Sequence, residues 1–168
     1  GKIFTFENNP AVEKPELLID LAHTVYGVAA HPKFTENGYV YVTYIHVADP
    51  AKETPDGSRL SRFQIAKGKP WQLDPGSEVK LLEWPNGGHN AGHIVFGPDG
   101  YLYLSAGDGS GIADELKTGQ DVSDLLGSLL RIGVDRPDTG KTYGIPKDNP
   151  FVGKAGARPE IWAYGLRQ

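Results

Sequence analysis

Hydrophobic and polar residues alternate with a period of two in three short segments, each of which begins with a glycine. These segments are residues 1–6 (GKIFTF), 38–43 (GYVYVT) and 100–105 (GYLYLS). Such alternation is typical of β-strands that bury one face. Further strand-like runs occupy residues 16–21, 26–30, 59–65, 79–84, 93–96, 129–134 and 159–166. The pattern therefore predicts an all-β fold.

A repeated hairpin organises the predicted strands. An apolar strand and a proline turn precede the second and third glycine-led segments, as in Gly97-Pro98-Asp99-Gly100. The proline presets φ for the turn, and the glycine supplies the positive φ that a tight hairpin requires. Gly38 and Gly100 are 62 residues apart, enough for a four-stranded antiparallel sheet with generous loops. Such sheets stack radially in β-propellers, so we predict a partial β-propeller with about three four-stranded antiparallel blades.

Little helix is expected in this chain. Its 22 Gly and 13 Pro residues interrupt regular structure throughout. The pattern supports one helix, a turn or two over residues 121–126, where Asp121 could cap and Val122, Leu125 and Leu126 share a face. Residues 49–58 and 135–156 are long irregular stretches, which in compact domains tend to be functional or disordered.

Composition and charge exclude several classes of partner. The net charge is −4 and no basic cluster exists, so we expect no nucleic-acid partner. No run of 18 apolar residues is present, so we expect no membrane span. The absence of Cys excludes disulfide scaffolds and thiol chemistry. The chain also lacks Met and begins at Gly1, from which we expect a fragment of a longer protein.

The segment 85–93 (PNGGHNAGH) is the most unusual connection in the chain. Its glycines let the backbone approach a ligand closely, and His89 and His93 lie directly before a predicted strand. A helical zinc site is disfavoured, because Asn90 stands where such a motif has Glu and the glycines oppose a helix. Two interpretations stay open from the residues alone. Either a histidine serves a site at the strand end, or both histidines only hydrogen-bond neighbouring loops.

Residues 107–111 (GDGSG) follow the third glycine-led strand. A calcium loop of the EF-hand type does not fit, because Ile112 and Ala113 occupy places where it needs an oxygen ligand and a glycine. The segment also matches neither the dinucleotide-binding pattern nor the Walker A pattern. We therefore interpret these residues as the turn by which the chain leaves the strand.

Five ordered segments carry a more specific indication. They are residues 26–34 (YGVAAHPKF), 89–100 (HNAGHIVFGPDG), 126–132 (LGSLLRI), 143–151 (YGIPKDNPF) and 158–167 (RPEIWAYGLR). Together they closely resemble the soluble glucose/sorbosone dehydrogenase family, which depends on pyrroloquinoline quinone (PQQ). The resemblance covers the whole chain. It implies a six-bladed β-propeller, of which residues 1–168 would be roughly the first half of a single domain.

The resemblance also implies PQQ-dependent oxidation of an aldose or related sugar. His89 matches the family's catalytic base, which takes the proton of the anomeric hydroxyl while hydride leaves C1 for the quinone. Arg167 matches an Arg beside cofactor and substrate, where its charge can stabilise a developing oxyanion, and Gln168 follows it at the cofactor. His23, Gly88 and His89 fall at substrate-binding positions. Calcium, which polarises the quinone, is the second implied cofactor.

Three residues depart from the family pattern. Gly88 replaces an acidic residue, Ala22, beside His23, stands where a substrate-binding Gln or Glu is expected, and Gln168 replaces an Asn. These departures support an alternative function, a catalytically inactive β-propeller binding module.

Further expectations concern the location of the protein, its substrate and its electron acceptor. The resemblance implies a periplasmic or secreted protein with a small-molecule sugar substrate and an electron acceptor such as a cytochrome or quinone. Most cofactor anchors would lie beyond Gln168, so we expect the isolated chain to be inactive.

Overall fold

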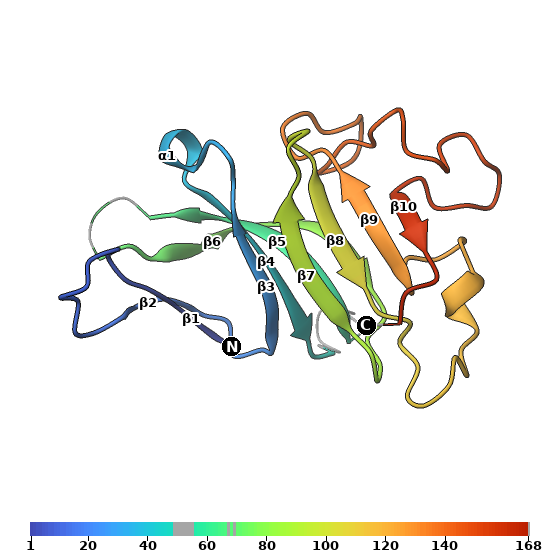
Figure 1. Ribbon diagram of the computed structural model, residues 1–168. Helices are drawn as coiled ribbons and strands as arrows, with labels where there is room; N and C mark the ends of the chain where they lie inside the picture. The colour runs from blue at the N-terminus through green and yellow to red at the C-terminus, as the bar shows by residue number, and fades with distance from the viewer. Residues whose placement is uncertain (49–55, 67, 69, 168) are drawn as a thin grey trace.

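The computed structural model describes residues 1–48, 56–66, 68 and 70–167 of the chain. These residues form ten β-strands, while helix is confined to single turns at α1 (Phe34–Asn37) and η2 (Thr118–Gln120) (Figure 1). The prediction of an all-β fold is confirmed. Most of the irregular stretch predicted at residues 49–58 lies outside this description, because residues 49–55 are not part of it, and Gly57 and Ser58 belong to a strand instead.

The strands form three antiparallel sheets in which neighbours in sequence are neighbours in space. The first sheet contains β1 (Lys2–Thr5) and β2 (Glu16–Asp20); the second has the order β3 (Val25–Ala30), β4 (Tyr39–His46), β5 (Gly57–Ile65) and β6 (Leu73–Trp84); the third has the order β7 (Ala91–Phe96), β8 (Leu102–Ala106), β9 (Ser128–Ile132) and β10 (Ile161–Tyr164). This up-and-down order is that of propeller blades.

The glycine-led strands do not all occupy the same place. The three similar segments predict equivalent positions, and this holds for two of them, because β4 and β8 are each the second strand of a four-stranded sheet. In contrast, β1 pairs with β2, and β2 leads directly into β3 as β6 leads into β7. Lys2–Thr5 therefore corresponds in position to β5, the strand before the last one of a four-stranded sheet. That first sheet has two strands in the described part of the chain.

The helix predicted over residues 121–126 is wrong. These residues form bends and turns that follow η2. The carboxylates of Asp121 and Asp124 accept hydrogen bonds from the backbone N–H groups of Ser123 and Leu126, at 2.8 and 2.7 Å. Such local bonds from a side chain to the backbone two residues on compete with helical hydrogen bonds. The apolar residues of the segment still contribute to the core.

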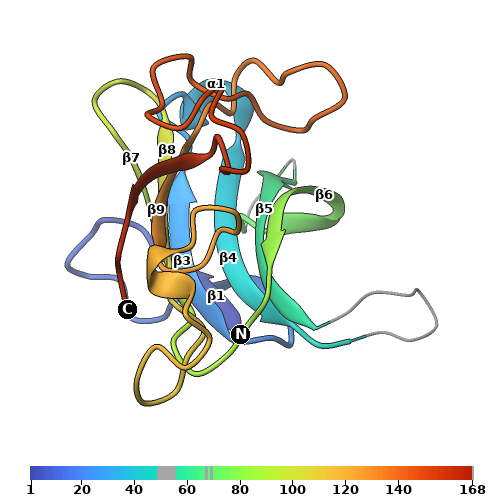
Figure 2. The same ribbon diagram turned by 90° about the vertical axis from the view of Figure 1, so that its right-hand side faces the viewer.

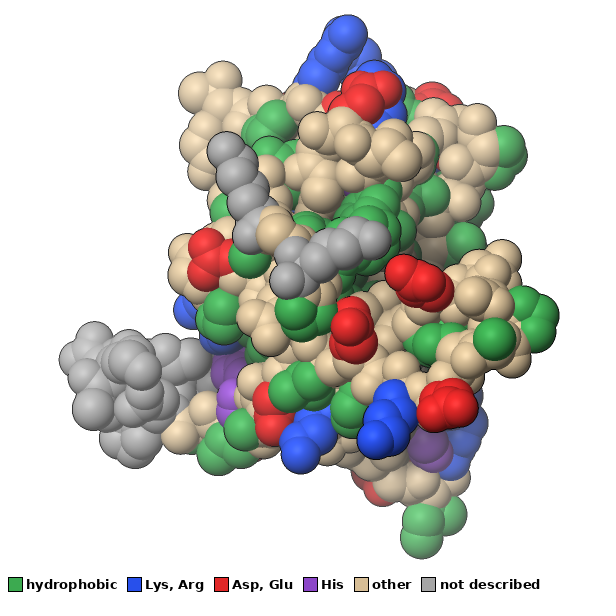
Figure 3. All heavy atoms as spheres, turned by 90° about the vertical axis from the view of Figure 1, so that its left-hand side faces the viewer, with side chains coloured by type: hydrophobic (Ala, Val, Ile, Leu, Met, Phe, Trp, Pro, Cys, Tyr) green, Lys and Arg blue, Asp and Glu red, His purple; other side chains and the backbone are tan. Residues whose placement is uncertain are grey.

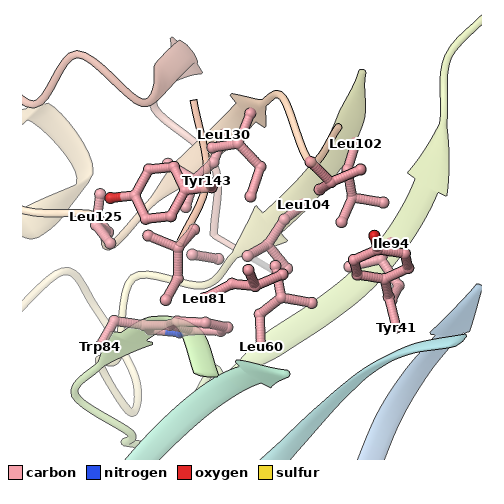
Figure 4. Close-up of a cluster of buried hydrophobic side chains, with 14 of the residues drawn as sticks. Tyr41, Leu60, Leu81, Trp84, Ile94, Leu102, Leu104, Leu125, Leu130 and Tyr143 are labelled. Carbon is pink, nitrogen blue, oxygen red and sulfur yellow. The ribbon is translucent and has the colours of Figure 1, made fainter. Parts of the chain in front are cut away.

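Two clusters of buried side chains hold the sheets together. The larger cluster lies between the second and third sheets, and Figure 4 shows Leu60 and Trp84 of one sheet facing Leu104 and Leu130 of the other. The smaller cluster joins the first and second sheets and includes Val42. Apolar and charged side chains remain mixed on the surface at the side of β1 and β2 (Figure 3).

The first strands of the second and third sheets, β3 and β7, lie side by side (Figures 1 and 2). A Cβ atom at Gly27 would lie 2.4 Å from the carbonyl oxygen of Gly92, so a side chain does not fit at Gly27. The Thr43 hydroxyl donates to the carbonyl oxygens of both glycines, at 3.4 Å for Gly27. This close approach sets the relative position of the two sheets.

Candidate functional site

Several connections meet at one end of the third sheet. Because the strands alternate in direction, β7 and β9 begin at this end, and β8 and β10 finish there (Figure 1). Residues 85–90, residues 107–127 and the segment after β10 are therefore brought together. These connections contain His89 and Arg167, two of the residues that the sequence analysis singled out.

The loop that carries His89 is pressed against residues 107–111. The N–H of Gly88 donates to the Gly109 carbonyl at 3.0 Å, and the N–H of Gly109 donates to the His89 carbonyl at the same distance. A Cβ atom would lie 2.0 Å from the Gly109 oxygen at Gly87, and 2.5 Å from the Ser110 oxygen at Gly88. At Gly88 this backbone leaves no room for the acidic side chain of the family pattern.

Asp108 holds the imidazole of His89. The Nδ1 atom of His89 lies 2.8 Å from Oδ1 of Asp108, which also accepts the N–H of Ser110 at 3.0 Å. The carboxylate side chain is 4% exposed and the imidazole 28% exposed. A carboxylate only accepts hydrogen bonds, so Nδ1 carries the proton of the neutral ring and Nε2 keeps its lone pair. The arrangement therefore leaves Nε2 able to take a proton.

Arg167 approaches the same carboxylate from the segment after β10. Its Nη1 atom lies 3.9 Å from Oδ2 of Asp108, and Nη2 donates to the carbonyls of Gly111, at 3.4 Å, and Ile112. The guanidinium is 49% exposed, and an ion pair of this exposure stabilises a fold by at most about 1 kcal/mol. The structure thus brings His89 and Arg167, 78 positions apart in sequence, to one carboxylate.

Sequence reasoning missed Asp108. It interpreted residues 107–111 as the turn that leaves the strand, and they do form that turn, but the turn also supplies a buried carboxylate. The available signal was the antiparallel pairing of the strand after His89 with the strand after Gly100. Extending that pairing places residue 108 near the histidine loop.

The remaining candidate residues do not join this cluster. His23 stacks on Tyr44 in the second sheet, with ring centroids 5.8 Å apart. His93 is exposed on β7, where its carbonyl accepts the hydroxyl of Ser105. Gln168 lies outside the described residues.

One residue of this cluster has the charge needed to hold PQQ, the first of the two implied cofactors. PQQ is an anion, and the half-exposed guanidinium of Arg167 can pair with a carboxylate or oxygen of such a group. For calcium, residues 1–48, 56–66, 68 and 70–167 contain no group of three or more His, Cys, Asp or Glu side chains placed to hold a metal ion. No helix of this part of the chain is long and apolar enough to cross a membrane.

Comparison with known proteins identifies the family to which the chain belongs. The family model for glucose/sorbosone dehydrogenases matches residues 6–168. The chain belongs to the glucose/sorbosone dehydrogenase family. Two curated relatives are the aldose sugar dehydrogenase YliI of Escherichia coli, 32% identical over 83% of this chain, and the Hedgehog-interacting protein of Mus musculus, 32% identical over 83% of this chain.

A solved structure from this family confirms the partial propeller. The oxidoreductase (glucose dehydrogenase) of Thermus thermophilus superposes on 99% of this chain with a TM-score of 0.75 at 27% identity. The present chain spans only part of each of these proteins. It covers 34% of YliI, 20% of the Hedgehog-interacting protein and 46% of the Thermus structure.

Proposed function

We propose that the protein containing this chain is a PQQ-dependent dehydrogenase that oxidises an aldose or related sugar at a CH–OH group. The contact of a partly exposed imidazole with a buried carboxylate, beside a half-exposed Arg, carries the proposal. Membership of the family and the name of the aldose sugar dehydrogenase YliI support it. Residues 1–168 would then be one part of a single propeller domain.

His89 acts as the general base in this proposal. Asp108 accepts the Nδ1–H of His89 and thereby orients the ring and selects its tautomer. Nε2 then takes the proton of the anomeric hydroxyl as the C1–H bond breaks. By the resemblance, His23 and Gly88 would also bind substrate; Gly88 would contribute backbone alone, and His23, which stacks on Tyr44, would do so from outside the cluster of His89, Asp108 and Arg167.

Arg167 supplies positive charge at the edge of the site. Its guanidinium is tied to two carbonyls of residues 111–112, so it is oriented before any ligand arrives. A fixed cation stabilises negative charge that develops on a nearby oxygen. When bound, PQQ supplies the two-electron acceptor. Arg167, with Gln168 beside it in sequence, would hold one edge of that cofactor, and we assign no step to calcium.

The test uses the full-length protein loaded with PQQ, with reduction of an artificial dye in the presence of aldoses as the readout. We expect His89→Ala to lower kcat by about 10² to 10⁴ while PQQ binding, followed by absorbance, changes little. The matched control is His93→Ala, since His93 is exposed on β7 and outside the cluster. A loaded wild-type protein that oxidises no sugar, or a fully active His89→Ala variant, would overturn the proposal.

A binding module is the second candidate function. The similarity to the Hedgehog-interacting protein, and the backbone packing that excludes an acidic side chain at Gly88, favour it. The same preparation separates the two candidates. A protein that takes up no PQQ but binds a protein partner would support the binding module.

The location of the proposed enzyme and its electron acceptor are tested separately. We propose a periplasmic or secreted location and an electron acceptor such as a cytochrome or quinone. Fractionation of cells that express the full-length protein tests the location. Reduction of a purified cytochrome or a soluble quinone by sugar and enzyme tests the acceptor.

A further inference from the structure

Gly127 joins the segments that carry the candidate site. Its N–H donates to the carbonyl of Gly107 at 2.9 Å, and its own carbonyl accepts the N–H of Leu166 at 2.9 Å. The residue next to each of these partners is a member of the cluster, Asp108 in one case and Arg167 in the other. Gly127 is therefore a backbone bridge between the two charged groups.

The conformation of this bridge requires glycine. Gly127 has φ +61°, and a Cβ atom there would lie 3.1 Å from Cα of Gly119, 3.2 Å from the carbonyl oxygen of Leu166 and 3.3 Å from that of Thr118. Positive φ is costly for residues with a Cβ atom. The atoms that would crowd this Cβ all belong to the backbone, which cannot move aside as easily as a flexible side chain.

Thr118 makes a second tie to Asp108. Its hydroxyl donates to the backbone carbonyl of Asp108 at 2.5 Å, and both residues are buried. This contact crosses the base of the loop formed by residues 109–117. Thr118 thus holds the backbone of Asp108, and Gly127 holds the backbone of the preceding residue, Gly107. Together the two hydrogen bonds fix the position from which the Asp108 carboxylate extends.

We propose that Thr118 and Gly127 are positioning residues for the proposed sugar oxidation. They fix Asp108 relative to Arg167, and Asp108 in turn keeps the proton of His89 on Nδ1 and the lone pair on Nε2. The inference rests on the proposed function of the site. Neither residue touches the reacting atoms, so both act through Asp108.

The physical reason is the irregular backbone around Asp108. Residues 107–127 contain one 3₁₀ turn and no strand, so beyond the bonds of Gly107 and Gly109 to residues 88–90 no sheet ladder holds this segment. Misplacing a catalytic group by about 1 Å can cost about a hundredfold in rate. The hydrogen bonds from the Gly127 N–H to the Gly107 carbonyl and from the Thr118 hydroxyl to the Asp108 carbonyl add to those between Gly109 and residues 88–89, and they tie Asp108 to the segments on its other side.

The decisive variant is Thr118→Val, which keeps the shape of the side chain and removes its hydroxyl. Thr118→Ser restores a hydroxyl and is the rescue variant. The matched control is Thr142→Val, because the Thr142 hydroxyl also donates to a backbone carbonyl, that of Lys80 at 2.8 Å, outside the cluster. All variants are made in the full-length protein, and folding is verified by circular dichroism.

The first readout needs no activity. Nitrogen-15 NMR of the histidine ring reports which nitrogen of His89 carries the proton. We expect predominantly Nδ1–H in the wild type, Thr118→Ser and Thr142→Val, and a mixture of tautomers in Thr118→Val. In sugar oxidation we expect Thr118→Val to lower kcat by about tenfold to a hundredfold and to change KM less.

Failure of the inference is distinguishable from failure of the proposed function. An unchanged His89 tautomer in folded Thr118→Val overturns the inference, whether or not any sugar is oxidised. A wild-type protein that oxidises no sugar overturns the proposed function, while the tautomer comparison still decides the positioning of His89. If Thr118→Val does not fold, Thr118→Ala and Gly127→Ala are compared in its place, and unchanged tautomers there count equally against the inference.

Discussion

His89 lies opposite Asp108 because the ladder between β7 and β8 contains a one-residue bulge. The ladder pairs Ile94 with Leu104, Val95 with Tyr103 and Phe96 with Leu102, but Ala91 with Ala106. A regular ladder continued from the first three pairs would set Asn90 opposite Asp108. The bulge uses positive φ at Ala91, +53°, and at Gly92, +103°. It therefore selects which side chain the buried carboxylate meets.

Substitution of Ala91 tests this bulge. We expect Ala91→Val to lose the contact between His89 and Asp108, because a β-branched residue is strongly disfavoured at positive φ. Ala91→Gly is the control and is expected to preserve the contact and the stability, since glycine adopts this conformation freely. The readouts are the melting temperature and the NMR signals of the His89 ring. Equal signals in the two variants would contradict the role of the bulge.

The close approach at Gly88 predicts an asymmetry between two glycines. Gly88→Ala should lower the free energy of unfolding by about 1–3 kcal/mol, because the added Cβ would meet the Ser110 carbonyl oxygen at 2.5 Å. Gly76→Ala should change the free energy by less than about 0.5 kcal/mol, since its Cβ would meet a movable side chain oxygen of Asp74 at 3.2 Å. Urea unfolding measures both. A Gly88→Ala protein as stable as Gly76→Ala would contradict this packing.

The core between the second and third sheets predicts a large effect at Leu104. This side chain is completely buried, so Leu104→Ala should lower the free energy of unfolding by about 2–5 kcal/mol through lost burial and a cavity. Ile112→Ala serves as the comparison, because Ile112 is 89% exposed and its truncation should cost less than about 0.5 kcal/mol. Denaturant unfolding of both variants gives the two values. Similar losses would show that the two sheets are not packed as described.

Glu160 predicts a component of stability that depends on acid pH. Burial of Glu160 tends to raise its pKa, but hydrogen bonds from the Tyr143 hydroxyl, at 2.6 Å, and from Arg158 Nε, at 3.2 Å, hold the pKa below its usual value of 4.5. As the pH falls below 4.5, the unfolded chain binds the proton first. The stabilisation is therefore present above this pH and is lost as the pH falls through the lowered folded-state pKa.

The measurement compares the wild type with Glu160→Gln over a range of pH. At neutral pH we expect the variant to be less stable, because a buried carboxylate that accepts these bonds is replaced by an amide. The difference in free energy of unfolding should shrink below pH 4.5. A difference that is independent of pH would mean that the carboxylate of Glu160 is not what these bonds stabilise.

Local sequence determined the strands and the repeated hairpin. Alternation of polar and apolar residues at 38–43 and 100–105 predicted β4 and β8, and both occupy the second place in their sheets. The turn at Gly97-Pro98-Asp99-Gly100 needs only the φ preferences of Pro and Gly. These features depend on neighbours within a few residues, which is why sequence alone predicts them. The same reasoning placed a helix at 121–126. There the Asp121 and Asp124 carboxylates accept backbone N–H groups instead, and these hydrogen bonds replace those of a helix.

Tertiary structure decided the membership of the candidate site. The His loop was visible in the sequence, but Asp108 entered the site through a bulge that shifts pairing by one residue. Its contact with Arg167 spans 59 positions and depends on the backbone bridge at Gly127. Such contacts arise from the register of strands and from close backbone approach. The hydrophobic pattern and the turn determine the regular register of a hairpin. They do not encode the bulge at Ala91 and Gly92, nor the backbone approach at Gly127, which joins segments distant in sequence.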